Sequence, residues 1–274
     1  MLIVKTVEAL KEAVSKLRND GKTIGLVPTM GALHDGHLSL IRRAGEENDA
    51  VVVSIFVNPV QFNNQADLIA YPRTLDADVE KIGTLADVVF APTPEEVYAV
   101  PPTEKYDFGA LEQVMEGPNR PGHFNGVGII VKRLFDWTTP DRAYFGEKDY
   151  QQLQIIRSLV KQTGLSVQIV PCPIVREPNG LAMSSRNKRL TAEQFEVAAN
   201  IHRIMLASTQ LPDNTVAKAK AYVESEIAKI SAFELEYYAI ADKDTLQPTD
   251  TLDNAIGCIA VWCGDVRLID NIMY

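Results

Sequence analysis

Two histidines separated by two residues, His34 and His37, follow a short apolar stretch that ends at Val27. The stretch predicts a β-strand, the residues around Gly31 and Gly36 predict a tight loop, and the apolar residues after His37 predict a helix. Side chains three residues apart share a helix face, and a helix N-terminus carries unpaired N–H groups and a partial positive charge. The pattern indicates an anion site, where two imidazoles would suit a phosphate chain whose charge grows during a reaction.

Other roles for this segment must be weighed. Histidines at this spacing also serve as capping or packing residues, and on the pair alone that alternative stays open. A zinc site is disfavoured, because the chain has only four histidines and its three cysteines show no ligand spacing. A Walker-type loop is disfavoured because His37 and Leu38 stand where Lys and Ser or Thr are required. No G-x-G-x-x-G sequence is present, so a dinucleotide fingerprint is absent.

Composition sets the outer bounds on the class of protein. A chain of 274 residues can form one large or two smaller domains, and its 46% hydrophobic and 23% charged residues are typical of a soluble globular protein. The net charge of −9 argues against a general nucleic-acid surface, and no apolar run is long enough to span a bilayer. Three scattered cysteines favour reduced thiols. We therefore expect a cytoplasmic protein with neither nucleic acid nor membrane as a partner.

Helical and strand patterns alternate along the first two thirds of the chain. Strands are expected at residues 23–27, 50–57, 88–90, 142–145 and 166–170. A first helix is expected from an N-cap at Thr6 to about residue 21, and a second from the loop at His37 to about residue 47. Further helices are expected at 75–85, 127–137 and 150–163. The near-continuous apolar run at 50–57 is typical of a strand buried on both faces of a parallel sheet. The alternation predicts an α/β fold with a Rossmann-like parallel sheet and helices on both faces.

The pattern changes in the last third of the chain. Two consecutive helices are expected at residues 192–208 and 216–230, followed by β-like runs at 234–241, 255–263 and 266–269. Helices followed by consecutive strands predict a smaller C-terminal α+β domain with an antiparallel sheet. The change lies near residues 184–188, so we expect domains of residues 1–184 and 185–274.

Polar residues at the ends of predicted strands could take part in the same chemistry. Asn58 and Gln61 follow the buried strand, at the sheet edge where open α/β sheets bind ligands, although ordinary turn formation explains Asn58 equally well. Lys148 could reach a phosphate. Asp149 and Gln152 beside it also fit a D-x-x-Q capping box, so a purely structural role stays open for them.

The segment from Ala182 to Arg189 combines small hydroxyl residues with several cations. Such a composition suits a flexible clamp for a polyphosphate. On composition alone it could equally be a solvated loop.

Taken in order, these segments resemble the pantothenate synthetase family over essentially the whole chain. The resemblance rests on P-T-M-G-A-L-H-D-G-H from Pro28, F-V-N-P-x-Q-F from Phe56, Y-P-R-T from Tyr71, R-P-G-H-F from Arg120, G-E-K-D-Y-Q-Q from Gly146 and M-S-S-R-N from Met183. The family belongs to the HIGH-type nucleotidyltransferase superfamily, in which H-D-G-H corresponds to the HIGH signature and M-S-S-R stands in for the KMSKS loop. Two departures, at residues 128–131 and at Asn119, touch none of the residues discussed here.

The resemblance implies a two-step, ATP-dependent ligase. The carboxylate of (R)-pantoate attacks the α-phosphorus of ATP to give pantoyl adenylate and pyrophosphate, and the amine of β-alanine then displaces AMP to give pantothenate. The resemblance also implies Mg²⁺ as a cofactor, with its protein ligands unassigned, and a homodimer. In this interpretation residues 1–184 bind nucleotide and pantoate, and residues 185–274 close over the active site.

The resemblance also implies roles for individual residues. His37 is expected as proton donor to a phosphate oxygen, and the other catalytic residues are His34, Lys148 and Arg186. Residues expected to bind ATP are Met30, Gly31, Ala32, Leu33, His34, Asp35, Gly36, His37, Gly146, Glu147, Lys148, Asp149, Val175, Met183, Ser184, Ser185 and Arg186. Residues expected to bind the small substrates are Asn58, Gln61, Tyr71 and Gln152.

Three rival functions make different predictions. A superfamily nucleotidyltransferase acting on a phosphorylated acceptor would need no amine, and Gln61 and Gln152 suit a hydroxylated acid better. A tRNA synthetase is disfavoured because the chain is short, acidic and without an evident basic appendage. A regulatory module would bind ATP without forming a product, and the presence of His37 and Lys148 argues against it.

Overall fold

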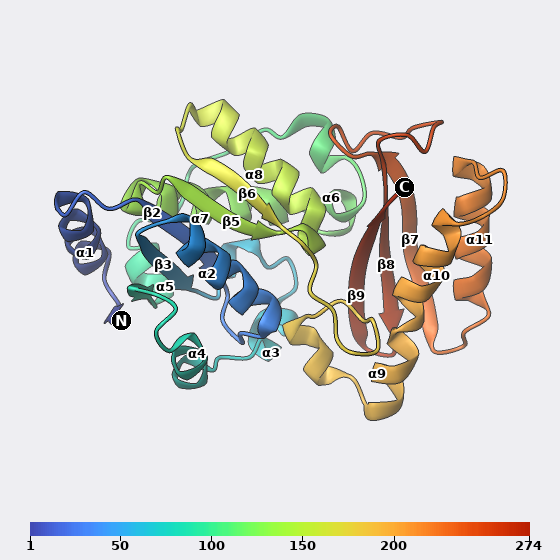
Figure 1. Ribbon diagram of the computed structural model, residues 1–274, viewed down its shortest axis with the longest axis horizontal. Helices are drawn as coiled ribbons and strands as arrows, with labels where there is room; N and C mark the ends of the chain where they lie inside the picture. Colours follow the sequence, from blue (N-terminus) through green and yellow to red (C-terminus); the bar gives the residue numbers. More distant parts are fainter. The chain divides into compact units, whose positions relative to one another are not determined.

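The computed structural model describes residues 1–274 and contains two compact units (Figure 1). Unit 1 comprises residues 1–108, 120–147 and 152–173, and unit 2 comprises residues 109–119, 148–151 and 174–274. The chain therefore passes between the units several times. The division between the units differs from the expected boundary at 184/185, and a functional boundary at that position stays a prediction.

Unit 1 is built on a six-stranded sheet in which every pairing is parallel. Its strands are β1 (Leu2–Val4), β2 (Ile24–Thr29), β3 (Ala50–Ile55), β4 (Val88–Phe90), β5 (Arg142–Gly146) and β6 (Gln168–Cys172), in the order β1-β4-β3-β2-β5-β6. The expected α/β fold with a Rossmann-like parallel sheet is confirmed. The chain order reverses between β2 and β5, and ligands of open α/β sheets bind beyond the carboxyl ends of strands at such a reversal.

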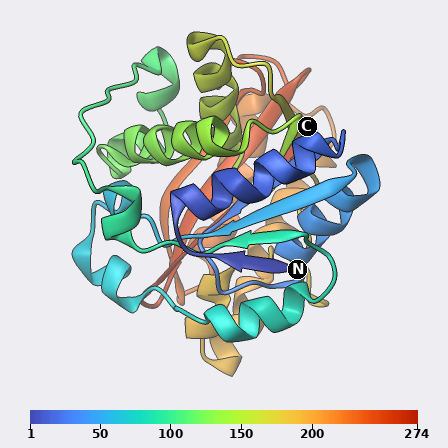
Figure 2. The same ribbon diagram turned by 90° about the vertical axis from the view of Figure 1, so that its left-hand side faces the viewer.

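Helices cover both faces of this sheet. They are α1 (Val7–Asn19), α2 (Asp35–Glu47), α3 (Gln65–Ala70), α4 (Leu75–Ile82), α5 (Pro94–Val97), α7 (His123–Thr138) and α8 (Tyr150–Thr163), with the short turns η1 (Pro59–Gln61) and η3 (Glu147–Asp149). Helix α2 packs on β2, β3 and β5 and contacts α4. Helices α1 and α7 pack against each other, and Figure 2 shows them on the side of the sheet opposite α4.

Local sequence explains these elements. The Thr6 hydroxyl accepts a hydrogen bond from the amide of Ala9, so Thr6 caps α1 as expected. The apolar run that begins at Ala50 forms β3, and Val51, Val52 and Val53 are each no more than 2% exposed. Burial on both faces requires apolar residues at consecutive positions, so the prediction from this run is confirmed.

Unit 2 contains an antiparallel sheet in the order β7-β8-β9, formed by β7 (Phe233–Asp242), β8 (Ala255–Cys263) and β9 (Val266–Met273). Its other elements are η2 (Gly109–Glu112), α6 (Glu116–Asn119), η4 (Ser185–Arg189), α9 (Ala192–Ala198), α10 (Asn200–Thr209) and α11 (Val216–Ala228). Its core joins apolar residues of α10 and α11 to one face of the sheet. The expected antiparallel sheet is confirmed.

One expected helix of unit 2 is interrupted. The apolar pattern of residues 192–208 predicts a single helix, but the helix stops after Ala198 and resumes at Asn200. The Asn200 side chain donates to the carbonyl of Val197 at 2.8 Å. A side chain that competes for a helical carbonyl in this way favours an interruption that apolar periodicity alone does not reveal.

None of the helices combines the length and the apolar character needed to cross a membrane.

Candidate functional site

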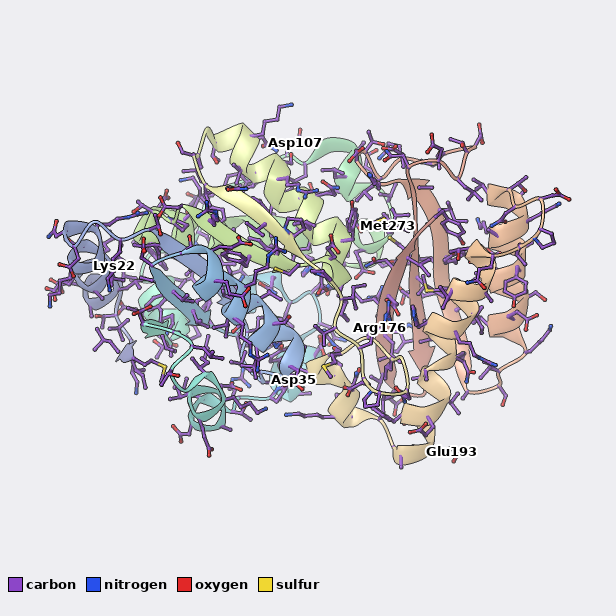
Figure 3. The ribbon with its side chains drawn as sticks, viewed as in Figure 1. Lys22, Asp35, Asp107, Arg176, Glu193 and Met273 are labelled. Atoms are coloured by element: carbon purple, nitrogen blue, oxygen red, sulfur yellow. The ribbon has the colours of Figure 1, made fainter.

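His34 and His37 lie at the junction between the loop after β2 and helix α2. His34 has an extended backbone and is the N-cap of α2, whose first residue, Asp35, is labelled in Figure 3. The His34 amide donates to Nδ1 of His37 at 3.3 Å, and the two ring centroids are 4.1 Å apart. Because Nδ1 of His37 accepts, the neutral ring carries its proton on Nε2, which suits a donor to phosphate oxygen. The two imidazoles lie together, as their spacing predicts.

The backbone of the loop before His34 is held by one buried carboxylate. Asp78 on α4 is 1% exposed, and it accepts hydrogen bonds from the amides of Ala32 and Leu33 at 2.9 and 2.7 Å. Thr74 at the start of the same helix donates to Asp78 at 3.1 Å. Backbone amides that do not pair within a sheet or a helix need such a partner when they are buried. Asp78 therefore supplies the acceptors that this loop requires.

The same loop is held from its carbonyl side and adopts an unusual conformation. Lys81, one helical turn after Asp78, donates to the carbonyl of Leu33 at 2.6 Å. Ala32 has a φ of 51°, a left-handed conformation that costs a residue with a Cβ atom about 1 kcal/mol or more. Gly31 has a φ of 81°, and a Cβ there would lie 3.1 Å from the Asp78 carboxylate. Contacts with α4 thus compensate for a backbone shape that the loop does not favour by itself.

The residues expected to bind the small substrates gather around the turn after β3. Asn58 is 1% exposed and its Nδ2 donates to Oε1 of Gln61 at 3.0 Å. Nε2 of Gln61 contacts the sulfur of Met30 at 3.1 Å, so an expected ATP residue and an expected pantoate residue are neighbours. Tyr71 packs edge-on against the ring of Phe62, the residue after Gln61. Gln152 lies in the first turn of α8 with a half-buried side chain.

Unit 2 carries the expected cationic and adenine-binding residues on two segments. Gly146 ends β5 and Glu147 follows it in unit 1, and the chain then enters unit 2 at Lys148. Val175 and Met183 belong to a hairpin-like loop, in which the amide of Met183 donates to the carbonyl of Val175 at 3.0 Å. This hydrogen bond brings together two residues expected to bind ATP.

The clamp segment after Met183 forms a 3₁₀ turn. The Ser184 hydroxyl caps the turn by accepting from the amide of Arg186 at 3.2 Å. Ser185 is 8% exposed, so its side chain is largely enclosed. The segment therefore forms a defined turn that Ser184 caps. Its binding to a polyphosphate stays a prediction.

Two consecutive residues of β9, Asp270 and Asn271, contact the loop that carries Val175 and the segment that carries Lys148. Asp270, 3% exposed at its side chain, forms a two-point ion pair with Arg176, which follows Val175. Arg176 is labelled in Figure 3. Asn271, the next residue, donates from Nδ2 to the carbonyl of Lys148 at 3.0 Å. Successive residues of a strand point to opposite faces of the sheet. The end of β9 therefore contacts the Arg176 side chain of the Val175 loop from one face and the backbone carbonyl of Lys148 from the other.

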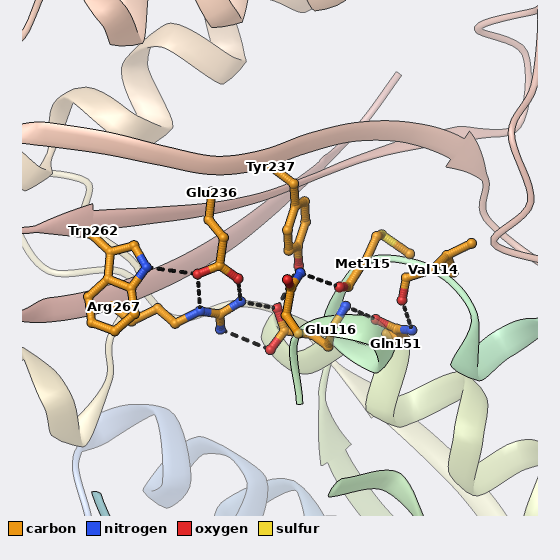
Figure 4. A network of polar contacts seen from close by, with 9 residues as sticks. Val114, Met115, Glu116, Gln151, Glu236, Tyr237, Trp262 and Arg267 are labelled. Carbon is orange, nitrogen blue, oxygen red and sulfur yellow. Dashed lines mark hydrogen bonds and ion pairs between the residues drawn. The ribbon is translucent and has the colours of Figure 1, made fainter. Parts of the chain in front are cut away.

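A second polar network of unit 2 anchors the start of α8. Figure 4 shows Arg267 between the carboxylates of Glu116 and Glu236, both at 2.7 Å from its Nη2. Gln151 accepts from the amide of Glu116 at 3.0 Å and donates to the carbonyls of Leu111 and Val114. Burial opposes the charged guanidinium, but its hydrogen bonds to Glu236 and Glu116 outweigh that effect and raise the pKa of Arg267. The guanidinium therefore stays charged at any physiological pH.

The residues of the chain provide no cage for a metal ion. No group of three or more His, Cys, Asp or Glu side chains is arranged to bind one. The carboxylate of Asp78, which contacts the loop, is occupied by backbone amides. A divalent cation here would have to share phosphate oxygens and water, as Mg²⁺ commonly does in nucleotide sites.

Several positioning residues lie outside the motifs, although each leaves a signal in the sequence. Leu75, Val79 and Ile82 form the apolar stripe of α4, and Asp78 interrupts that stripe with a carboxylate. Asp270 likewise interrupts the apolar alternation along β9. An acidic residue on a core-facing position must have a buried partner. The sequence marks such positions but does not identify the partner.

The chain is similar to known proteins over its whole length. The family model described as pantoate-beta-alanine ligase matches residues 2–273. The chain is 54% identical to the pantothenate synthetase of Phocaeicola vulgatus and 51% identical to that of Bacteroides thetaiotaomicron, in each case covering 100% of this chain and 99% of the relative.

Solved structures give the same result. The crystal structure of pantothenate synthetase from Thermus thermophilus superposes with a TM-score of 0.94 at 41% identity and covers 100% of this chain and 99% of its own. The pantoate-beta-alanine ligase of Francisella tularensis, described as complexed with beta-gamma ATP and beta-alanine, gives a TM-score of 0.84 at 36% identity, covering 100% and 97%.

The Asp78 contacts lead to a stability prediction. In Asp78→Asn one carboxylate oxygen becomes an NH₂ group that faces a backbone N–H, so a buried amide loses its acceptor. We expect the free energy of unfolding to fall by ~1–3 kcal/mol, measured by urea denaturation. Asp76→Asn, at an exposed position of the same helix, is the matched control and should change stability by no more than about 0.5 kcal/mol. Equal denaturation midpoints for the two variants would contradict the role given to Asp78.

Proposed function

The chain belongs to the pantoate–β-alanine ligase family, and we propose that it condenses (R)-pantoate with β-alanine, using ATP, by way of pantoyl adenylate. The observation that carries this proposal at the level of residues is the contact between Gln61 and Met30, because it joins the expected acid site to the expected nucleotide loop. The match of the family model to residues 2–273 supports the assignment over the whole chain.

In the first step a pantoate carboxylate oxygen bonds to the α-phosphorus of ATP, and the bond from that phosphorus to the bridging oxygen of pyrophosphate breaks. Two anions must approach each other, so the main tasks of the protein are to neutralise charge and to align the attack. His34 and His37 at the start of α2, with the N-terminal end of that helix, provide donors and partial positive charge for this purpose. We assign Lys148, Ser184, Ser185 and Arg186 to the phosphate chain as well.

In the second step the β-alanine nitrogen bonds to the acyl carbon, the bond from that carbon to the AMP oxygen breaks, and the nitrogen loses a proton. A carboxylate does not react with an amine until one of its oxygens becomes a leaving group, and AMP makes it one. Gln61 and Gln152 are proposed to hold pantoate through its hydroxyls and carboxylate. Asn58 and Tyr71 lie beside Gln61, by direct contact and through Phe62 respectively, and complete the proposed acid site.

The nucleotide is proposed to lie along residues 30–37, with adenine at the backbone of Val175 and with residues 146–149 beside the ribose and phosphates. Mg²⁺ is part of the proposal with no protein ligand assigned, and when bound it would supply Lewis-acid stabilisation to the phosphate chain. A homodimer in the cytoplasm, where ATP is available, completes the proposal. Light scattering of the purified chain would test the dimer.

His37 is expected to contribute to the rate more than to binding. A donor whose hydrogen bond strengthens as charge develops on the pyrophosphate stabilises the transition state, so His37→Ala should lower kcat by about 10²-fold or more. The KM for ATP should change far less, as steady-state kinetics would show. Turnover within a few-fold of the wild type would favour a packing role for this ring.

Lys148 and Arg186 are expected to act on the phosphates through their charge. Lys148→Ala and Arg186→Ala should impair adenylate formation, while melting temperatures stay close to that of the wild type because both side chains are only partly buried. Lys148→Arg should restore activity incompletely, since a planar guanidinium and a compact ammonium contact phosphate differently. A large loss of melting temperature in Lys148→Ala, with normal kinetics, would instead indicate a structural role.

Exchange of labelled pyrophosphate into ATP tests the proposed intermediate directly. If pantoate is activated before the amine binds, exchange should require pantoate and Mg²⁺ and proceed without β-alanine. A nucleotidyltransferase acting on a phosphate ester would show no exchange dependent on pantoate, and a regulatory module would show none. Release of ADP in place of AMP would overturn the adenylate mechanism.

A further inference from the structure

The turn that carries Gln61 is tied to two other elements of unit 1. Asn58, almost fully buried, donates from Nδ2 to the carbonyl of Gly126 on α7 at 3.1 Å. The hydroxyl of Tyr98, the residue after α5, donates to Oδ1 of Asn58 at 2.6 Å. The Val60 amide donates to the same oxygen at 3.3 Å. The oxygen and the nitrogen of the Asn58 amide therefore both have partners within the protein.

These partners fix the orientation of the Asn58 amide. A backbone carbonyl can only accept, so the amide atom facing Gly126 must be the nitrogen. A backbone N–H can only donate, so the atom facing Val60 must be the oxygen. A flipped amide would set two donors against each other at Val60 and two acceptors against each other at Gly126. The hydrogen-bond network thus allows one orientation, which is the criterion by which side-chain amides are assigned.

The hydroxyl of Tyr98 is itself held as a donor. Its ring packs against Phe56, and the guanidinium of Arg133 lies 4.9 Å from the ring centroid. Burial raises the pKa of the Tyr98 phenol well above its usual range, with a smaller opposing effect from Arg133. The phenol therefore keeps its proton throughout the physiological range and can donate to Asn58.

Close approach of α7 makes this arrangement possible. A Cβ at Gly126 would lie 2.6 Å from the carbonyl oxygen of Val60 and 2.7 Å from the backbone of Gln61, so only glycine fits. In the same helix His123 lies with Nδ1 2.8 Å from the carbonyl oxygen of Gln61, which requires a proton on Nδ1. The backbone of Gln61 is therefore as firmly held as the amide of Asn58.

The orientation of Asn58 determines which end of Gln61 is presented. Nδ2 of Asn58 donates to Oε1 of Gln61, so Nε2 points away from Asn58 and toward Met30. A thioether sulfur is a weak acceptor, and a carboxylate or hydroxyl oxygen would be a stronger partner for this NH₂ group. The turn thus presents a hydrogen-bond donor beside the nucleotide loop.

We propose that Tyr98 and Asn58 are positioning residues that fix the side-chain amide of Gln61 so that its NH₂ end faces the acid substrate. This chain of hydrogen bonds from Tyr98 through Asn58 to Gln61, called the relay below, favours a substrate with a carboxylate or hydroxyl oxygen at this position. It disfavours a substrate with an ammonium group there. This inference rests on the proposed function, because it assigns Gln61 to the acid. It gives Asn58 an indirect role in place of direct contact with substrate.

Tyr98→Phe tests the relay with the least disturbance, because it removes one oxygen and keeps the ring between Phe56 and Arg133. We expect the KM for pantoate to rise about fivefold or more, with a smaller change in kcat and no change in the KM for ATP. Tyr144→Phe is the matched control, since that buried hydroxyl also bonds side chains of unit 1, Glu47 and Asn48, outside the proposed site. The control should leave the KM for pantoate unchanged.

Asn58→Asp tests the direction of the amide. The new carboxylate can no longer donate to Gln61, so the Gln61 amide should turn its nitrogen toward residue 58 and its oxygen toward the substrate. We expect the KM for pantoate to rise by about 10²-fold, more than in Tyr98→Phe, because an acceptor would then face an acceptor. An equal KM for pantoate in Asn58→Asp and the wild type would contradict the relay.

A double-variant comparison separates positioning from a general structural effect. In a Gln61→Ala background there is no amide left to orient, so adding Tyr98→Phe should change the KM for pantoate by less than about twofold. A full additive effect in that background would overturn the proposal. Pyrophosphate exchange by the wild type, measured first, separates failure of the proposed function from failure of the relay. If exchange does not depend on pantoate, the proposed function fails. If it does, but the KM for pantoate is normal in Tyr98→Phe, only the relay fails.

Discussion

The buried carboxylate of Asp78 satisfies the backbone amides at the point where β2 passes into α2. A loop at the carboxyl end of an inner strand has no neighbouring strand to pair with, and a left-handed residue such as Ala32 adds strain. Asp78 and Lys81 fix one peptide segment from its donor and acceptor sides. The position of His34 at the start of α2, and through it that of His37, depends on this short piece of backbone.

The chemistry explains why the backbone must be held so firmly. Donors that stabilise developing charge act best when they are aligned before the reaction, since reorientation during it would cost part of their effect. The ring of His37 accepts from the backbone amide of His34, and both residues lie at the start of a helix that packs against β2, β3 and β5. In unit 2 the same principle applies to β9, where Asp270 and Asn271 hold the Val175 loop and the carbonyl of Lys148. Rigid strands and helices thus determine the positions of loops that carry the proposed contacts.

The sequence predicts the elements of this fold better than the links between them. Thr6, the valines of β3 and the run that forms β8 act through local propensity or burial, so their pattern is enough. The break after Ala198 is invisible to periodicity because it lies inside an apolar pattern, where the Asn200 side chain donates to a helical carbonyl. The passage of residues 109–119 and 148–151 into unit 2 is equally beyond prediction, since it depends on contacts such as those between Glu116 and Arg267, which are far apart in the chain.

In the candidate site, too, the sequence predicts contacts between residues close in the chain but not contacts between distant segments. Motif spacing places His34 with His37, and Asn58 with Gln61, because each pair lies within one turn of chain. The role of Asn58 requires the structure. Its Asn-Pro context predicts a turn, and the turn is present, but Tyr98 and Gly126 come from distant segments and use the polar atoms that the sequence assigns to a ligand. A side-chain amide has one donor end and one acceptor end, so the group that it can offer to a substrate depends on which end its neighbours occupy. An amide residue at a strand end can therefore indicate a site, while the hydrogen bonds behind it decide whether that site offers a proton or accepts one.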